Sequence, residues 1–225
     1  MSSVRIEVFG LACSLAGMTL FFPARSQGAE TIIEGSVKLP PPKPASAAAS
    51  RYQQKAGTVG IPDPPVAVVY LEGSFPAPRT TSPPAGKVEQ KNYQFSPGIL
   101  PILRGSKVVF PNEDDDYHHV FSYSKTKEFD LGRYRKNEEQ AAVTFDKVGV
   151  VKIGCEIHDH MRAFILVLDT PHFTKTDPAG KFRLTLKDVP DGKYVLKAWV
   201  NEKTTWEKPV ELKQGSPVSV MFPGK

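Results

Sequence analysis

The sequence has few cysteines, no stripe of basic residues and no long stretch of helical periodicity. Only 2 of its 225 residues are Cys. Lys and Arg exceed Asp and Glu by five (29 − 24), and they are not gathered into a stripe interleaved with aromatic residues, which argues against nucleic acid as a partner. Because apolar residues do not recur at helical spacing over long stretches, a helical protein is not expected.

The composition is that of a folded protein. Hydrophobic residues make up 40% of the chain and charged residues 24%, which excludes a disordered polymer, a fibrous repeat and a polytopic membrane protein. The 21 Pro and 17 Gly lie among many short runs rich in Val, Ile and Phe. This pattern favours an all-β protein.

The first 29 residues have the features of a cleavable secretory signal. Arg5 precedes an apolar stretch over 8–22 that is short for a membrane span, and small residues follow it. We therefore expect residues 1–29 to be removed on export to the periplasm, leaving no membrane span; a retained N-terminal anchor is the alternative. Cys13 leaves with the signal. The mature chain then has one cysteine, Cys155, which cannot form an internal disulfide and needs burial or a metal ion in an oxidising compartment.

Short runs of β-forming residues, bounded by turn residues, predict the strands. Eleven of the 21 Pro lie between Pro40 and Pro84. That region is therefore expected to be mostly exposed loop, at 45–65 and 73–85, around isolated strands. The predicted strands cover 31–39, 66–71, 87–95, 102–110, 119–123, 141–145, 150–154, 163–168, 181–186, 194–199, 209–212 and 217–222.

Residues that can bind a metal are concentrated in two short segments. Four of the five histidines lie in 110–122 and 155–161, and the second segment also holds Cys155 and Met161. A thiolate, two imidazoles and a weak thioether form a donor set that suits copper. Cys155, His158 and Met161 are spaced three apart, so one tight loop can fold all three inward, and His118 on a neighbouring strand can supply the fourth ligand.

Three other interpretations of these residues stay open. Zinc could be bound by Cys155, His118 and His158 with a carboxylate such as Asp159, since zinc accepts these ligands and does not favour Met. Cys155 could be a buried thiol without a metal. A nucleophilic Cys/His pair is the third, although no orienting residue or oxyanion donor can be named for it.

Residues 87–169 resemble the cupredoxins, the small blue copper proteins, of the periplasmic type labelled methylamine utilisation proteins. The resemblance rests on Asn112, on His118 six residues later and on Val120, together with the Cys155-x2-His158-x2-Met161 loop. It implies a Greek-key β-sandwich with one type 1 copper, in which His118, Cys155 and His158 are equatorial ligands and Met161 is the axial ligand. The chain departs from the usual motif at Tyr117 and His119, and at Asp159 and His160 in the loop.

The flanking strands resemble a small transthyretin-like, carboxypeptidase regulatory-like β-sandwich. The matching segments are 34–37, 67–71, 176–182 and 189–194. We therefore predict an all-β protein with a signal peptide at 1–29, a discontinuous outer sandwich from 30–75 plus 170–225, and a cupredoxin sandwich at 86–169 inserted in it or flanked by it.

The predicted function is one-electron transfer between a protein donor and a protein acceptor by a monomeric, exported copper protein that is not an enzyme. A copper-binding or delivery module is one alternative, and a structural partner-binding protein is another. The other residues near the motifs are expected to have structural roles. We expect His119 and His160 to be exposed, the charged runs 113–116 and 125–136 to be solvated loops, and Trp199 and Trp206 to pack in the outer domain.

Overall fold

The computed structural model describes residues 30–42, 59–75, 85–138 and 140–223, so the predicted signal at 1–29 lies outside the described residues. Every regular element in the described ranges is a β-strand, which confirms the predicted all-β class. Within the same ranges, no helix is long and apolar enough to cross a membrane.

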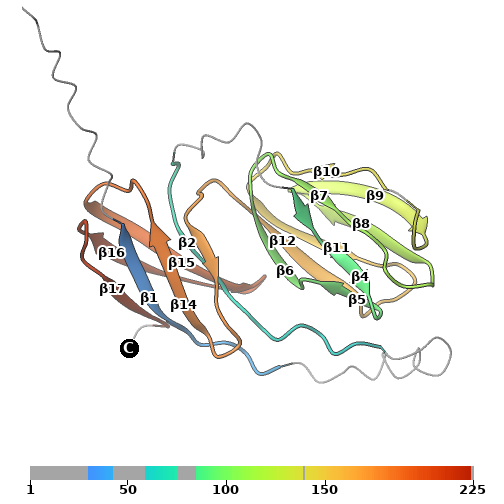
Figure 1. Ribbon diagram of the computed structural model, residues 1–225, viewed down its shortest axis with the longest axis horizontal. Helices are drawn as coiled ribbons and strands as arrows, with labels where there is room; N and C mark the ends of the chain where they lie inside the picture. The colour runs from blue at the N-terminus through green and yellow to red at the C-terminus, as the bar shows by residue number, and fades with distance from the viewer. Residues whose placement is uncertain (1–29, 43–58, 76–84, 139, 224–225) are drawn as a thin grey trace, which may run out of the picture.

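The strands fall into two units that lie side by side (Figure 1). The outer unit joins strands from both ends of the chain, because β1 pairs antiparallel with β14 and parallel with β17, and β2 pairs antiparallel with β13 and β15. Its sheets have the orders β14-β1-β17 and β13-β2-β15-β16. The strand bounds are β1 Thr31–Val37, β2 Val68–Leu71, β13 Phe173–Lys175, β14 Lys181–Leu186, β15 Gly192–Asn201, β16 Thr204–Leu212 and β17 Val218–Phe222.

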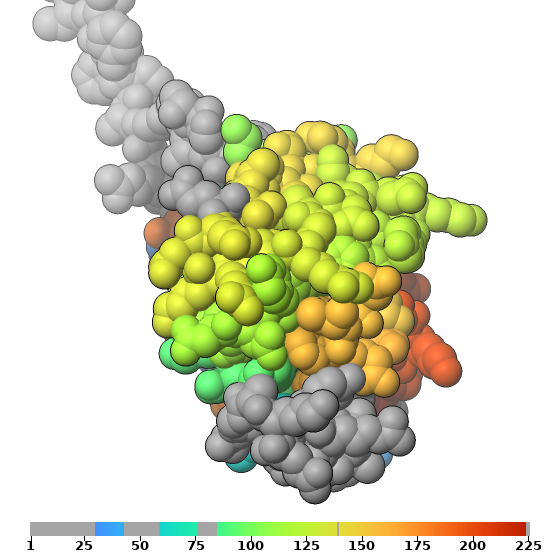
Figure 2. Space-filling view, turned by 90° about the vertical axis from the view of Figure 1, so that its right-hand side faces the viewer, coloured from blue at the N-terminus to red at the C-terminus, as the bar shows by residue number. Residues whose placement is uncertain are grey.

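The inner unit is continuous in sequence and faces the viewer in Figure 2. Its largest sheet has the order β6-β12-β11-β8-β9, and it also holds the smaller sheets β10-β7-β3 and β4-β5. Whether the two units fold as the separate domains predicted at 30–75 plus 170–225 and at 86–169 stays a prediction. The strand bounds are β3 Gly86–Lys87, β4 Glu89–Lys91, β5 Gln94–Ser96, β6 Ile99–Leu103, β7 Lys107–Val109, β8 His118–Ser124, β9 Lys127–Tyr134, β10 Val143–Thr144, β11 Gly149–Gly154 and β12 Arg162–Leu168.

Each unit has its own hydrophobic core, and a smaller cluster joins them. The joining cluster contains Val68 of β2, Leu166 and Leu168 of β12, and Trp199 of β15. Trp199 therefore packs between the units rather than only inside the outer one. Trp206, which was also expected to be packed, is 37% exposed on β16, so that expectation is wrong.

The basic run 125–136 is mostly strand rather than solvated loop, which corrects the expectation. It forms β9, which pairs antiparallel with β8. Phe129 and Leu131 pack on the inner core and Tyr134 is buried, while the charged residues between them stay at least partly exposed. Charged side chains are common on edge strands because they discourage pairing with other chains. The charges of this run therefore occupy outward positions of a strand whose alternate residues pack on the core.

The proline-rich approach to β2 is also less exposed than predicted. The part of 45–65 up to residue 58 lies outside the described residues, but Val59 is buried in the inner core. The backbone NH of Gly60 donates to the carbonyl of Asn92, and Asp63 accepts a hydrogen bond from the NH of Gly98. These contacts attach the segment before β2 to the surface of the inner unit.

Candidate metal centre

Two strand ends bring the predicted ligands together. β11 lies between β8 and β12 in the large sheet and runs antiparallel to both. Because of this direction, the end of β11, which is followed by Cys155, meets the beginning of β8, which starts at His118. His158 and Met161 follow in the loop between β11 and β12. The candidate centre therefore lies at one end of the inner sandwich.

Backbone hydrogen bonds close the loop from Cys155 to Met161. The NH of Cys155 donates to the carbonyl of Met161 at 3.3 Å, and the NH of Met161 donates to the carbonyl of His158 at 2.9 Å. Arg162 adds a bond from its Nε to the carbonyl of Asp159 at 2.9 Å. Met161 is fully buried in the same hydrophobic cluster as Cys155. The short loop thus has a defined shape.

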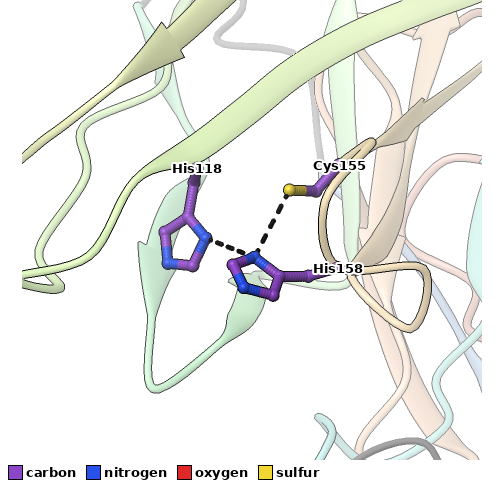
Figure 3. Close-up of side chains that lie close together, drawn as sticks. All are labelled: His118, Cys155 and His158. Atoms are coloured by element: carbon purple, nitrogen blue, oxygen red, sulfur yellow. Dashed lines mark hydrogen bonds between the residues drawn. The ribbon is translucent and has the colours of Figure 1, made fainter. Parts of the chain in front are cut away.

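The side chains of His118, Cys155 and His158 converge on one point (Figure 3). Nδ1 of His118 lies 3.0 Å from Nδ1 of His158, which lies 3.6 Å from Sγ of Cys155. One donor atom from each residue lies within 4.8 Å of the other two, and all three residues are buried. Two imidazole nitrogens and one sulfur around a common point fit a single ion of the kind that soft to intermediate ligands bind.

The surroundings of Cys155 favour the thiolate. Burial alone would raise the pKa of its thiol, but hydrogen bonds from His118, from His158 and from backbone amides together lower that pKa to about 6. One of these amides is the NH of His119, 3.4 Å from the sulfur. A thiolate is the form that binds metal ions, so the site provides its sulfur donor near neutral pH.

The pKa of His118 is shifted in the opposite direction from that of Cys155. Burial alone would lower the pKa of this imidazole, but its contacts with Asp114 and Cys155 raise the pKa to about 8. Burial would also raise the pKa of Asp114, yet hydrogen bonds from His118 and from two backbone amides lower it. In the protein without metal, the centre therefore pairs a thiolate with an imidazolium near neutral pH.

These shifts predict how the metal-free protein titrates. We expect the ultraviolet absorption of the Cys155 thiolate to appear with a midpoint near pH 6, because the pKa is lowered to about 6 from an ordinary value of 9.0. The measurement is a difference titration against a Cys155→Ser variant. A midpoint near the ordinary value of a free thiol would contradict the charge pairing described above.

His119 and His160 are not exposed, which corrects the expectation drawn from strand alternation for His119 and from loop position for His160. The His119 side chain is 8% exposed and its Nε2 lies 2.6 Å from Oδ1 of Asp130 on β9. The His160 side chain is 6% exposed and its Nε2 lies 3.0 Å from the carbonyl of Tyr93. A sequence pattern gives the direction of a side chain but not what covers it. Here β9 lies against the His119 ring, and the hairpin of β4 and β5 lies against the His160 ring. Neither joins the three-residue donor group found among the described residues.

Two residues beside the centre were not identified from the sequence. The Tyr93 ring stands edge-on to both histidines. Its centroid lies 5.3 Å from that of the His118 ring and 5.1 Å from that of the His158 ring. Asp114 lies within the acidic run 113–116, which was expected to be a solvated loop, but its side chain is only 12% exposed and contacts His118. The sequence places Asp114 close to His118 but does not distinguish it from Asp115 and Asp116, and nothing in the sequence connects Tyr93 to this site.

Comparison with known proteins finds similarity only among solved structures. No family model and no curated protein sequence matches the chain. A Cu-containing nitrite reductase from Thermus scotoductus SA-01 is similar at 23% identity and a TM-score of 0.37, over 44% of this chain and 26% of that one. A purple cupredoxin from Nitrosopumilus maritimus has 22% identity and a TM-score of 0.33, over 37% of this chain and 99% of that one.

A mutant of amicyanin in the Cu(I) state is also similar, at 16% identity and a TM-score of 0.35, over 44% of this chain and 98% of that one. The chain thus spans about a quarter of the nitrite reductase and nearly all of the two smaller proteins. With every TM-score below 0.4 and every identity below 25%, these similarities assign neither a family nor a ligand. Whether this centre suits a metal ion therefore depends on its own donor atoms.

Proposed function

We propose that the chain binds one copper ion and transfers single electrons between two protein partners. His118, Cys155 and His158 would hold the ion, with Met161 as a weaker fourth ligand. The observation that carries this proposal is the convergence of two imidazole nitrogens and one thiolate sulfur within 4.8 Å in a buried position. This set, with a thioether at the end of the same loop, is the combination that favours copper electron-transfer sites.

Copper would supply a reversible one-electron change between Cu(II) and Cu(I). The contribution of the chain is to hold its donors in one arrangement for both oxidation states. His118 is held at a strand end and Cys155 directly follows a strand, while backbone hydrogen bonds close the loop between Cys155 and Met161. Burial of all three donor residues limits access by water. A donor set that does not rearrange favours fast electron transfer.

The exposure of the loop carboxylates weighs against the zinc alternative. That alternative uses a carboxylate beside His118, Cys155 and His158, and the loop contains two, Glu156 and Asp159. Their side chains are 60% and 72% exposed, whereas Met161 is fully buried in the cluster that contains Cys155. The loop therefore presents a thioether, and not a carboxylate, on its buried side. This arrangement supports copper over zinc.

The cellular setting is part of the same proposal. A periplasmic location follows from the predicted signal at 1–29, and the partners would be a protein electron donor and a protein acceptor that meet a monomeric carrier. No chemical transformation of a substrate is assigned to this chain.

Adding one equivalent of Cu(II) to the protein tests the proposal. We expect an intense visible charge-transfer band, narrow copper hyperfine splitting in the electron paramagnetic resonance spectrum, and reversible one-electron voltammetry. A protein that stays colourless with Cu(II), or that binds zinc in preference to copper, would overturn the proposal.

Replacing Met161 with Leu separates a weak ligand from an essential one. We expect Met161→Leu to retain one copper per chain and to raise the reduction potential, because losing a sulfur donor disfavours Cu(II) more than Cu(I). Voltammetry measures the change. Met221→Leu is the matched control, since Met221 is 53% exposed on β17 of the outer unit. Loss of all copper from Met161→Leu would contradict the role of a weak fourth ligand.

A further inference from the structure

We propose that Asp114 is a positioning residue of the metal centre, which orients His118 toward the ion and lowers the reduction potential by stabilising Cu(II). This inference rests on the proposed function, because it concerns the same centre. It assigns a role to a residue of the acidic run that supplies no donor atom to the ion.

The carboxylate of Asp114 is held by three hydrogen bonds. Its Oδ2 lies 2.8 Å from Nε2 of His118 and accepts a bond from the NH of Tyr93 at 2.9 Å. Its Oδ1 accepts a bond from the NH of Asn92 at 2.7 Å. The NH of Asp114 itself donates to Oδ1 of Asn112 at 2.9 Å. With a side chain that is 12% exposed, Asp114 has little freedom to leave the imidazole.

The contact determines which nitrogen of His118 carries a proton. An ionised carboxylate can only accept hydrogen bonds, so Nε2 of His118 must be the donor. In the neutral imidazole this leaves the lone pair on Nδ1, the atom that lies 3.0 Å from Nδ1 of His158. Carboxylates that receive the second NH of a metal-binding histidine orient its ring and increase its basicity. Asp114 would do both for His118.

The hairpin turn between β4 and β5 links Asp114 to the other side of the site. Asn92 and Tyr93 form this turn with φ values of 52° and 58°, the left-handed conformation that a type I′ hairpin turn requires at both of its central positions. In this conformation both amides bond to the Asp114 carboxylate, and the Tyr93 ring lies against His118 and His158. One carboxylate therefore connects the turn, the ring and the ligand.

The sign of the effect on potential follows from charge. A fixed negative charge that hydrogen-bonds to a ligand stabilises Cu(II) more than Cu(I), because Cu(II) carries the larger positive charge and the interior screens it weakly. Replacing Asp114 with Asn removes that charge and nearly preserves the shape of the side chain. This change should therefore favour Cu(I) and raise the reduction potential.

The test compares Asp114→Asn with Asp115→Asn in the copper-loaded protein. Both changes remove one negative charge, but Asp115 is exposed. We expect Asp114→Asn to weaken Cu(II) binding about 10- to 100-fold and Cu(I) binding less. Each factor of ten by which Cu(II) binding is weakened more than Cu(I) binding raises the reduction potential by about 59 mV for a one-electron couple. Equal potentials for the two variants would overturn the role of Asp114.

A second measurement needs no variant and covers the case in which Asp114→Asn does not fold. Nitrogen-15 NMR of the wild-type protein in the diamagnetic Cu(I) form should place the His118 proton on Nε2, in a strong hydrogen bond. A proton-free Nε2 would overturn the proposal even if copper binds as expected. A wild-type protein that takes up no copper would instead overturn the proposed function, and with it the claim about potential.

Discussion

Cys155→Ser is expected to abolish the intense visible band of the copper protein and its reversible one-electron cycling. The band requires charge transfer from a thiolate sulfur, and the structure provides that thiolate near neutral pH because the pKa of Cys155 is lowered to about 6. A serine hydroxyl has nearly the same shape but does not ionise in this range. Exchanging one sulfur for one oxygen therefore removes the strongest donor while leaving the fold in place.

Visible absorption and electron paramagnetic resonance spectra after addition of Cu(II) measure this effect. His160→Gln serves as the control, because His160 is equally well buried in the same loop, bonds to the carbonyl of Tyr93, and lies outside the donor group. We expect His160→Gln to retain the band, since an amide can still donate to that carbonyl. If the spectra of Cys155→Ser and the unaltered protein are the same, the copper is held elsewhere and electron transfer through Cys155 is wrong.

Trp199→Ala is expected to lower the free energy of unfolding by about 3–5 kcal/mol, the usual range for removing a buried Trp. Trp199 is 4% exposed in the cluster between the two units, and its ring centroid lies 5.6 Å from that of Phe164 on β12. The truncated side chain would leave a cavity between strands of different units, where neither can close it alone. Copper binding by the folded protein should be unchanged.

Chemical denaturation of the metal-free protein, followed by far-ultraviolet circular dichroism, measures the loss. Trp206→Ala is the matched control because Trp206 lies 37% exposed on the neighbouring strand β16. We expect that control to change the free energy of unfolding by about 0.5 kcal/mol, as exposed substitutions do. Equal losses for the two variants would show that the contact between the units adds no stability.

The loop from Cys155 to Met161 could be recognised from the sequence because its chemistry is local. Three potential ligands stand three residues apart in a segment that follows a strand, so spacing alone limits where their side chains can go. His118 lies farther away in the sequence, but its segment is rich in histidine, as the loop is. The structure brings the donor atoms of His118, Cys155 and His158 together and buries Met161 in the cluster that contains Cys155.

The surroundings of the site could not be predicted in the same way. Tyr93 lies 25 residues before His118, and its ring reaches both histidines only because a hairpin turn carries it there. The burial of His119 depends on β9, whose charged outward residues resemble those of a solvated loop in the sequence. Each of these features depends on a pairing between segments that no local pattern specifies.

The amino-acid sequence by itself determined the all-β class and the identity of the candidate donors, because strand alternation and ligand spacing are properties of neighbouring residues. Only the tertiary structure decided the protonation of the donors and what surrounds them. The thiolate of Cys155, the orientation of His118 by Asp114 and the position of Trp199 between the units all arise from burial and hydrogen bonds between distant segments. Such contacts exist only once the strands have paired, since pairing both excludes water and brings the charged groups together.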